Sequence, residues 1–303
     1  MSGTDCWSRR PTELAVLRIV VFTIWLVLLA NMDLSLFADL PAEALRPTGL
    51  VVLLPLDTLA ASPHLLTAVR LVAMIGCVAC VVGVRPWRGI AATTVVLLLV
   101  CDGLAKSVGW YANHAQFAPL VAAALLAVAP SADRLSLPRR APAVPDVSSL
   151  RHGAPMFAVA LLVTLSYSLV AARRIFEGGG SVFVDHSILE WSVLRSLEDH
   201  HYPWDFGLVL LENQWLLPLM ATGFAITTLF ELLSPLALHH RRFRVAWLAV
   251  VIPFHFGTLI LMNIFFWENL LILAVLFTAL PRLAGGGRSR EASDPDTVAR
   301  PMP

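Results

Sequence analysis

The chain has 303 residues, of which 57% are hydrophobic and 14% are charged, and its formal net charge is +1. Soluble globular domains carry about 25% charged residues, so this composition excludes a soluble domain and indicates an integral membrane protein. A net charge this close to zero also argues against a nucleic-acid partner and against a strongly acidic one.

Eight apolar runs along the chain have about the 20 residues that a helix needs to cross a bilayer. They cover residues 13–32, 64–84, 89–110, 113–130, 154–175, 214–237, 244–263 and 265–281. The segment 45–60 is also apolar, but it is short and broken by Pro47 and Pro55, so we expect it to lie at the interface or to re-enter the membrane. We therefore predict an all-α, polytopic integral membrane helix bundle, with about eight transmembrane helices over residues 13–281.

The distribution of lysine and arginine sets the predicted orientation, because cytoplasmic loops are enriched in both. One set of alternate connections holds 15 of them, namely Arg9, Arg10, Arg85, Arg88, Arg134, Arg139, Arg140, Arg151, Arg241, Arg242, Arg244, Arg282, Arg288, Arg290 and Arg300. The other set holds five, namely Arg46, Lys106, Arg173, Arg174 and Arg195. We therefore predict a multi-pass protein of the plasma membrane with both termini cytoplasmic. Residues 1–12 would form a short N-terminal segment and 282–303 a disordered tail.

Cys77 and Cys80 form a CxxC pattern inside the apolar run 64–84. Such a pair can be redox-active, as in a thiol–quinone oxidoreductase. An oxidoreductase of that kind also needs a cysteine in a loop to pass electrons on, and the sequence offers none. We interpret both residues as small packing side chains and keep the oxidoreductase as the least supported alternative.

Polar side chains gather at the outer ends of the predicted spans. Asp102 and Lys106 are spaced i,i+4, so they share a helix face and can pair. The others at this level are Asn31, Asp33, Tyr111, Asn113, His114, Arg173, Arg174, Glu177 and Asn263, and His255 lies near the middle of its span. Because charged residues within a span usually face a cavity or a partner, we expect a polar cavity open to the outer side. The alternative is a set of separate residues at headgroup level.

Arg173 and Arg174 lie on the side that the charge bias disfavours, so we interpret them as functional rather than as a membrane anchor. Their forked hydrogen-bond donors suit an anionic or carbonyl group of a substrate. The predicted substrate-binding set also contains Asp102, Asn113 and Asn263. The predicted catalytic set is His114, His255 and Lys106, with the histidines moving protons.

Residues 181–205 form a long outer connection. Ile188, Trp191, Leu194 and Leu197 recur at three-residue steps, which predicts an amphipathic helix lying on the membrane. The segment EDHH at 198–201 has metal-ligating side chains, but two adjacent histidines need a third ligand from elsewhere, so we predict no metal site.

Glu231 lies in the inner half of the predicted span 214–237. A buried carboxylate needs a partner, and we expect either a backbone group or an arginine from a neighbouring helix. Pro235 and Pro253 are expected to kink their helices and to leave carbonyl groups free to accept hydrogen bonds.

Four motifs, in their order and spacing, resemble those of a known family. They are WYANHAQFAPLVAAALLAVAPSADRLSL at 110–137, SYSLVAARRIFEGG at 166–179, FELLSPLAL at 230–238 and FHFGTLILMNIFFWENLLIL at 254–273. Over 13–281 the chain is similar to the HTTM (horizontally transferred transmembrane) domain, which the vitamin K-dependent gamma-glutamyl carboxylases share. The resemblance implies a multi-helix membrane domain, and its carboxylase members bind reduced vitamin K and work on the outer face.

The same resemblance bears on the arginine pair. In the carboxylases a tyrosine-containing helix ends in a lysine pair, and one of these lysines is the base for vitamin K oxygenation. Tyr167 followed by Arg173 and Arg174 takes that place here, and arginine cannot act as a general base because its pKa exceeds about 12. The resemblance therefore implies the fold without the lysine base. His114 and His255 match positions where the family carries histidines.

Two function hypotheses follow from the sequence. The first is an HTTM membrane protein that acts on a quinone, a lipid or a secreted peptide in the outward cavity. Its cofactor would be a quinone or a reduced vitamin K-like molecule, and its partners membrane lipid and such a quinone or peptide, with no nucleic acid. The second is a non-catalytic scaffold or partner protein for the export or maturation of a secreted peptide, as bacterial relatives imply. A transporter is a weaker alternative, because we find no internal inverted repeat.

Overall fold

The computed structural model describes residues 7–41, 44–46, 52–53, 62–107, 116–137, 145–178, 185–198, 204 and 206–278. Within these ranges the regular structure is helical, apart from an isolated antiparallel bridge between Arg9 and Ser149. Six of the helices in these ranges are long and apolar enough to cross a membrane. By length and composition, this confirms an all-α fold with the character of a multi-pass membrane protein.

The six long helices are α1 (Pro11–Asn31), α3 (Pro63–Val82), α4 (Trp87–Ser107), α6 (Leu150–Gly178), α9 (Leu217–Leu232) and α11 (Arg241–Met262). Two further apolar helices, α5 (Phe117–Val128) and α12 (Trp267–Phe277), have 12 and 11 residues. At 1.5 Å per residue these two are about 17 Å long, short of the roughly 30 Å of a bilayer core. The eight predicted spans thus correspond to six long helices and two shorter ones in the described ranges, and the number that cross the membrane stays a prediction.

The remaining elements are short, apart from α7 (Asp185–Glu198). They are η2 (Leu34–Asp39), η6 (Phe206–Leu208), α8 (Val209–Glu212), η7 (Gln214–Leu216) and α10 (Leu236–His239). Helix α7 confirms that 181–205 contains a helix, and its apolar residues divide between two faces. Ile188 is buried against the bundle, whereas Trp191, Leu194 and Leu197 are exposed. Its position at the membrane interface stays a prediction, and most of the segment 45–60 lies outside the described residues.

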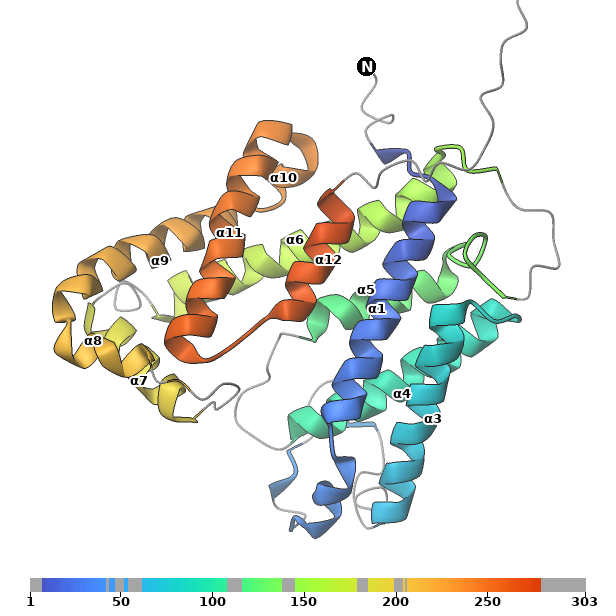
Figure 1. The fold of residues 1–303 in the computed structure, drawn as a ribbon, viewed down its shortest axis with the longest axis horizontal. Helices are drawn as coiled ribbons and strands as arrows, with labels where there is room; N and C mark the ends of the chain where they lie inside the picture. The colour runs from blue at the N-terminus through green and yellow to red at the C-terminus, as the bar shows by residue number, and fades with distance from the viewer. Residues whose placement is uncertain are drawn as a thin grey trace, which may run out of the picture.

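Helix α6 connects two groups of helices. Figure 1 shows α1, α3 and α4 on one side, α9 and α11 with α7 and α8 on the other, and α6 running obliquely between them. Helix α6 has 29 residues. At 1.5 Å per residue it is about 43 Å long, which exceeds the roughly 30 Å of hydrocarbon, so in a membrane it would tilt or extend its charged ends into the headgroup regions.

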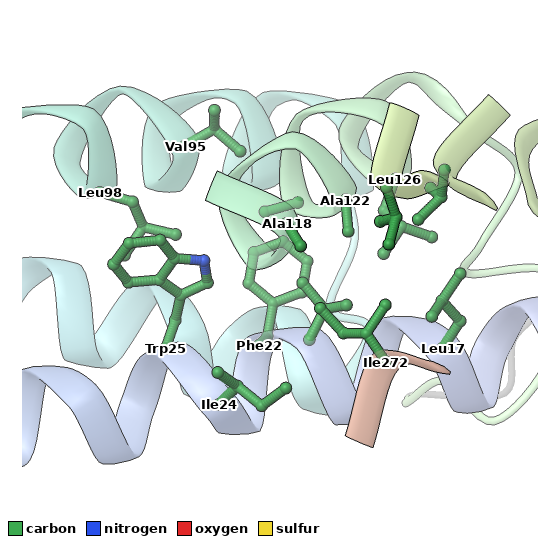
Figure 2. Packing of buried hydrophobic residues seen from close by; sticks show 14 of the residues in the cluster. Leu17, Phe22, Ile24, Trp25, Val95, Leu98, Ala118, Ala122, Leu126 and Ile272 are labelled. Carbon is green, nitrogen blue, oxygen red and sulfur yellow. The ribbon is translucent and has the colours of Figure 1, made fainter. Parts of the chain in front are cut away.

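The main core lies around α1, which packs against α3, α5 and α12, with side chains of α4 completing it. Phe22 and Trp25 of α1 are fully buried. Figure 2 shows Phe22 against Ala118 of α5 and Trp25 against Leu98 of α4. The small alanine side chains of α5 let the helix backbones approach closely, as is typical of helix packing in membranes.

Arg18 of α1 is fully buried and joins α1 to two other segments by hydrogen bonds to their carbonyl groups. Its guanidinium donates to the carbonyl oxygens of Val81 at 3.3 Å, Ser131 at 3.0 Å and Leu135 at 2.5 Å. It also packs 5.5 Å from the ring centre of Trp87. Val81 lies in the last turn of α3 and the other two follow α5, where carbonyl groups lack helical donors. Arg18 therefore holds α3 and the turn after α5 against α1.

The segment before α1 is tied to the start of α6. The Thr12 hydroxyl donates to Asp146 at 2.6 Å and its amide donates at 3.3 Å, while Arg9 and Ser149 exchange backbone hydrogen bonds. Burial acts to raise the pKa of the Asp146 carboxyl, but the Thr12 hydrogen bonds and nearby arginines outweigh it and lower the pKa. The ionised carboxylate of Asp146 therefore holds the residues before α6 against the start of α1.

Gly83, the residue that caps the C-terminal end of α3, packs directly against the Arg18 guanidinium. Its φ is 74°, and a Cβ there would lie 2.5 Å from the Arg18 guanidinium and 2.8 Å from Cβ of Ser136. We predict that Gly83→Ala lowers the free energy of unfolding in detergent by about 2 kcal/mol, through the left-handed backbone and the displaced guanidinium. Gly89→Ala is the control, because a Cβ at Gly89 of α4 meets nothing within 4 Å. Equal thermal midpoints for the two variants would contradict the packing described.

Candidate functional site

The described site residues lie on three helices. These are Asp102 and Lys106 on α4, Arg173 and Arg174 near the end of α6, and His255 and Asn263 at α11 and its C-terminal cap. Asn113 and His114 lie outside the described residues. Figure 1 shows α4 beside α1 and α3, away from α9 and α11. The structure places Arg174 of α6 and His255 of α11 on either side of the ring of Phe254, at 5.8 and 5.9 Å, and leaves the α4 pair elsewhere.

Asp102 and Lys106 form the ion pair that their spacing predicted. The Lys106 ammonium donates to Oδ2 of Asp102 at 2.8 Å, and the two side chains are 19% and 8% exposed. A buried carboxylate is costly unless a cation and hydrogen bonds compensate it. Lys106 supplies that compensation for Asp102, so the pair has a structural explanation within α4.

Tyr167 of α6 and His255 of α11 form a hydrogen bond between helices in the other half of the bundle. The Tyr167 hydroxyl lies 2.8 Å from Nε2 of His255, and both side chains are buried. The ring of Trp247 packs edge-on against Tyr167 at 5.7 Å, and the ring of Phe266 lies 5.4 Å from the imidazole. The pair thus sits in an aromatic enclosure, with Pro253 two residues before His255 inside α11.

Glu231 of α9 takes its partner from α6. The Arg174 guanidinium forms a short ion pair with the carboxylate, whose side chain is 2% exposed. The guanidinium also lies 5.0 Å from the ring centre of Phe224 and 5.8 Å from that of Phe254. The expectation of an arginine from a neighbouring helix is confirmed. Arg174 is therefore held in place by one anion and two aromatic rings.

The two arginines predicted to act together have different surroundings. Arg173 donates to Glu177 at 2.6 Å, and these side chains are 76% and 64% exposed. The prediction placed Arg174 below the outer headgroups and Glu231 in the inner half of its helix, yet the two are in contact. Both predicted depths cannot hold for upright, parallel helices. Figure 1 shows α6 running obliquely between the two groups of helices, and its second half contacts the end of α9 through Arg174 and Ser168.

Hydroxyl groups fasten α6 to the end of α9, which the sequence reasoning missed. Ser168 donates to the carbonyl oxygen of Leu232 at 2.7 Å, and Ser234 donates to that of Thr164 at 2.6 Å. Serine and threonine are common where membrane helices meet, because their hydroxyls bond across the contact. The signal in the sequence was the series Thr164, Ser166 and Ser168 inside an apolar run.

Asn263 has a structural role at the C-terminal end of α11. It is buried, has a φ of 53°, and its backbone N–H donates to the carbonyl oxygen of Thr258. Asparagine tolerates this left-handed conformation better than most residues, so it ends a helix well. A second missed residue is Glu268 in the first turn of α12, which is 4% exposed and has an oxygen without a hydrogen-bond partner in the described part of the chain. It lies two residues after Phe266, the ring that covers His255.

Cys77 and Cys80, the predicted CxxC pair, have packing surroundings in the described part of the chain. Cys77 and Cys80 are buried free thiols, and Cys80 donates to the Thr94 hydroxyl at 3.7 Å. Within the described ranges, no group of three or more His, Cys, Asp or Glu side chains is placed to hold a metal ion. Residues 199–201 of the EDHH segment lie outside those ranges.

An apolar groove of about 510 Å³ opens on the surface of α1 and α3. Its lining residues are Leu26, Leu71, Met74, Ile75, Val78, Ala79, Val82 and Val84. These side chains offer contacts to an apolar chain but no hydrogen-bonding group. The groove is separate from the Tyr167–His255 pair, which lies between α6 and α11.

Compared with protein-family models, curated proteins and solved structures, the chain matches none.

The ion pair between Arg174 and Glu231 predicts different outcomes for the two arginines. Arg174→Ala leaves a buried carboxylate without its cation, so we expect it to lower the free energy of unfolding in detergent by about 3–5 kcal/mol. Arg173→Ala is the matched control, and it should leave the unfolding midpoint unchanged because its partner Glu177 is exposed. Adding Glu231→Ala to Arg174→Ala should recover part of the loss. Equal midpoints for the two single variants would contradict the pairing.

Proposed function

We propose that the protein binds a quinone between α6, α9 and α11 and exchanges a proton with it at His255. The observation that carries this proposal is the buried hydrogen bond of 2.8 Å between Tyr167 and His255. Aromatic rings enclose the pair, with Trp247 on the tyrosine and Phe266 on the imidazole. A planar, lipid-soluble ring that bears oxygen atoms is the ligand class that suits both the rings and the proton-exchanging pair.

The proposed chemistry is acid–base catalysis by the imidazole. A bound hydroquinone gives the proton of its hydroxyl group to Nδ1 of His255, while Nε2–H of the same ring donates to the Tyr167 oxygen before and after the transfer. Removal of bulk water strengthens these interactions, because the surrounding side chains form a medium of low dielectric constant. Since both residues are buried, the ligand reaches the imidazole by displacing a covering ring such as Phe266.

Arg174 is the proposed orienting group for the ligand. Its guanidinium lies 5.8 Å from the ring of Phe254, and that ring lies 5.9 Å from the imidazole of His255. A guanidinium presents planar, forked donors that suit a quinone carbonyl or a deprotonated ring oxygen. The carboxylate of Glu231 fixes its position, so the donors are oriented before the ligand binds.

The resemblance to the HTTM domain supports a quinone over other planar ligands. It aligns Tyr167 with the tyrosine-containing helix of the carboxylases and His255 with one of their histidines. It also places Arg173 and Arg174 where those enzymes have their lysine base. We therefore propose proton exchange with a quinone and no carboxylation.

The proposed orientation rests on the charge distribution, with 15 lysine and arginine residues assigned to one side and five to the other. Both termini are then cytoplasmic, in the plasma membrane, and the site opens to the outer side.

The second candidate function is a non-catalytic membrane scaffold. One observation favours it: the Arg174–Glu231 pair, together with Ser168 and Ser234, joins α6 to α9. Buried polar groups that satisfy one another can serve packing alone. In this reading a secreted peptide or its exporter is the partner, and the protein binds no quinone.

Binding of a reduced short-chain naphthoquinone separates the two functions. We predict that the purified protein in detergent binds it saturably, measured by quenching of tryptophan fluorescence, and that His255→Gln weakens binding about 10-fold through loss of one hydrogen bond. His239→Gln is the matched control, because His239 is exposed at the end of α10. The scaffold function gives no saturable binding. Equal affinities for His255→Gln and the native protein would also exclude the proposed site.

A further inference from the structure

Three side chains form a chain of hydrogen bonds where α6 begins, outside the Tyr167–His255 site. Ser149 Oγ lies 2.8 Å from Nδ1 of His152, and Nε2 of His152 lies 3.1 Å from Oδ2 of Asp133. The imidazole is 4% exposed, whereas Ser149 is half-buried and within reach of a ligand. A serine, a histidine and an aspartate in this order are the three groups of an acyl-transfer site.

The carboxylate determines which imidazole nitrogen carries the proton. An ionised carboxylate only accepts hydrogen bonds, so Nε2 of His152 donates to Asp133. In the neutral imidazole Nδ1 then has a lone pair, and the Ser149 hydroxyl donates to it. This is the arrangement in which a histidine can take the proton of a serine nucleophile.

The backbone around Ser149 supplies the other requirement of acyl transfer. Ser149 directly precedes α6, and the Gly153 amide donates to its carbonyl at 3.0 Å. The backbone N–H groups of residues 150–152, in the first turn, have no carbonyl acceptor within the helix. They can therefore donate to an oxyanion and stabilise it. Two backbone hydrogen bonds with Arg9, of 3.2 and 2.9 Å, fix the position of the serine.

The surface beside Ser149 is apolar and carries one cation. Val147 and Leu150 flank the serine and are 68% and 52% exposed. Arg151 is 66% exposed and lies 3.1 Å from Asp133. Exposed apolar side chains at the start of a membrane helix suit acyl chains, and an exposed guanidinium suits an anionic headgroup.

We propose that Ser149 is the nucleophile of an ester-hydrolase site for acyl lipids. Its oxygen bonds to the ester carbonyl carbon while its proton passes to Nδ1 of His152. The bond from that carbon to the alcohol oxygen then breaks, and the alcohol leaves with the proton from His152. A water molecule adds hydroxide to the acyl carbon, its remaining proton returns through His152 to Ser149, and a carboxylic acid is released. Asp133 is a positioning residue that holds the imidazole.

Covalent labelling with an alkyl fluorophosphonate tests this proposal on the full-length protein in detergent. The expected result is a single phosphonate on Ser149, located by mass spectrometry of the peptide, together with hydrolysis of a p-nitrophenyl acyl ester. His152→Gln should slow labelling about 100-fold, the size of a general-base contribution. Ser148→Ala is the matched control, because Ser148 is exposed and adjacent, and it should label at the native rate.

The Asp133 variants separate positioning from a purely structural contact. Asp133→Asn should slow labelling, and Asp133→Glu should restore part of the rate, with thermal midpoints recorded for each. Native, folded protein that stays unlabelled would overturn the proposal without any variant. Labelling of His152→Gln at the native rate would overturn it as well. Neither result affects quinone binding at His255, so the two proposals fail independently.

Discussion

The interior of a bilayer offers no water to a polar side chain, and this constraint organises the described helices. Arg18 meets three carbonyl groups, Arg174 meets a carboxylate, and Arg70 donates to the carbonyl oxygens of Leu29 and Ala30 at the end of α1. Each of these partners belongs to another segment. The contact that satisfies a guanidinium therefore also determines which helices pack together. Charged side chains that are expensive in an apolar core thus become the groups that specify the fold.

Helix α6 is held by polar contacts at its start and in its second half. Its start is fastened to the N-terminal segment through Ser149, and its second half is fastened to α9 and α11 through Tyr167 and Arg174. The helix runs obliquely between the two groups of helices in Figure 1, so its polar residues contact different segments at its two ends. Both proposed sites lie along this one helix, and the hydrogen bonds that position it also orient their reactive groups.

The sequence predicted those features that depend on local pattern. Apolar runs located the long helices, and i,i+4 spacing paired Asp102 with Lys106. The buried carboxylate of Glu231 needed a partner, either a backbone group or an arginine, and Arg174 of α6 is that partner. Contacts between distant segments could not be predicted, because hydropathy says nothing about helix tilt. The predicted cavity is the clearest case. The sequence put Arg174 and Asp102 in one outer cavity and Glu231 in the inner half of its span, whereas Arg174 contacts Glu231 and Asp102 pairs with Lys106 on α4.

The central claim is that a quinone binds between α6 and α11. Photoaffinity labelling with a diazirine-bearing naphthoquinone, mapped by mass spectrometry, tests it most directly. The expected result is label on the peptides of α6 and α11 that contain Tyr167 and His255, and loss of that label when the unmodified quinone competes. Label confined to the apolar groove of α1 and α3, lined by Leu71 and Val78 among others, would show a lipid-like contact without hydrogen bonding and would contradict the claim.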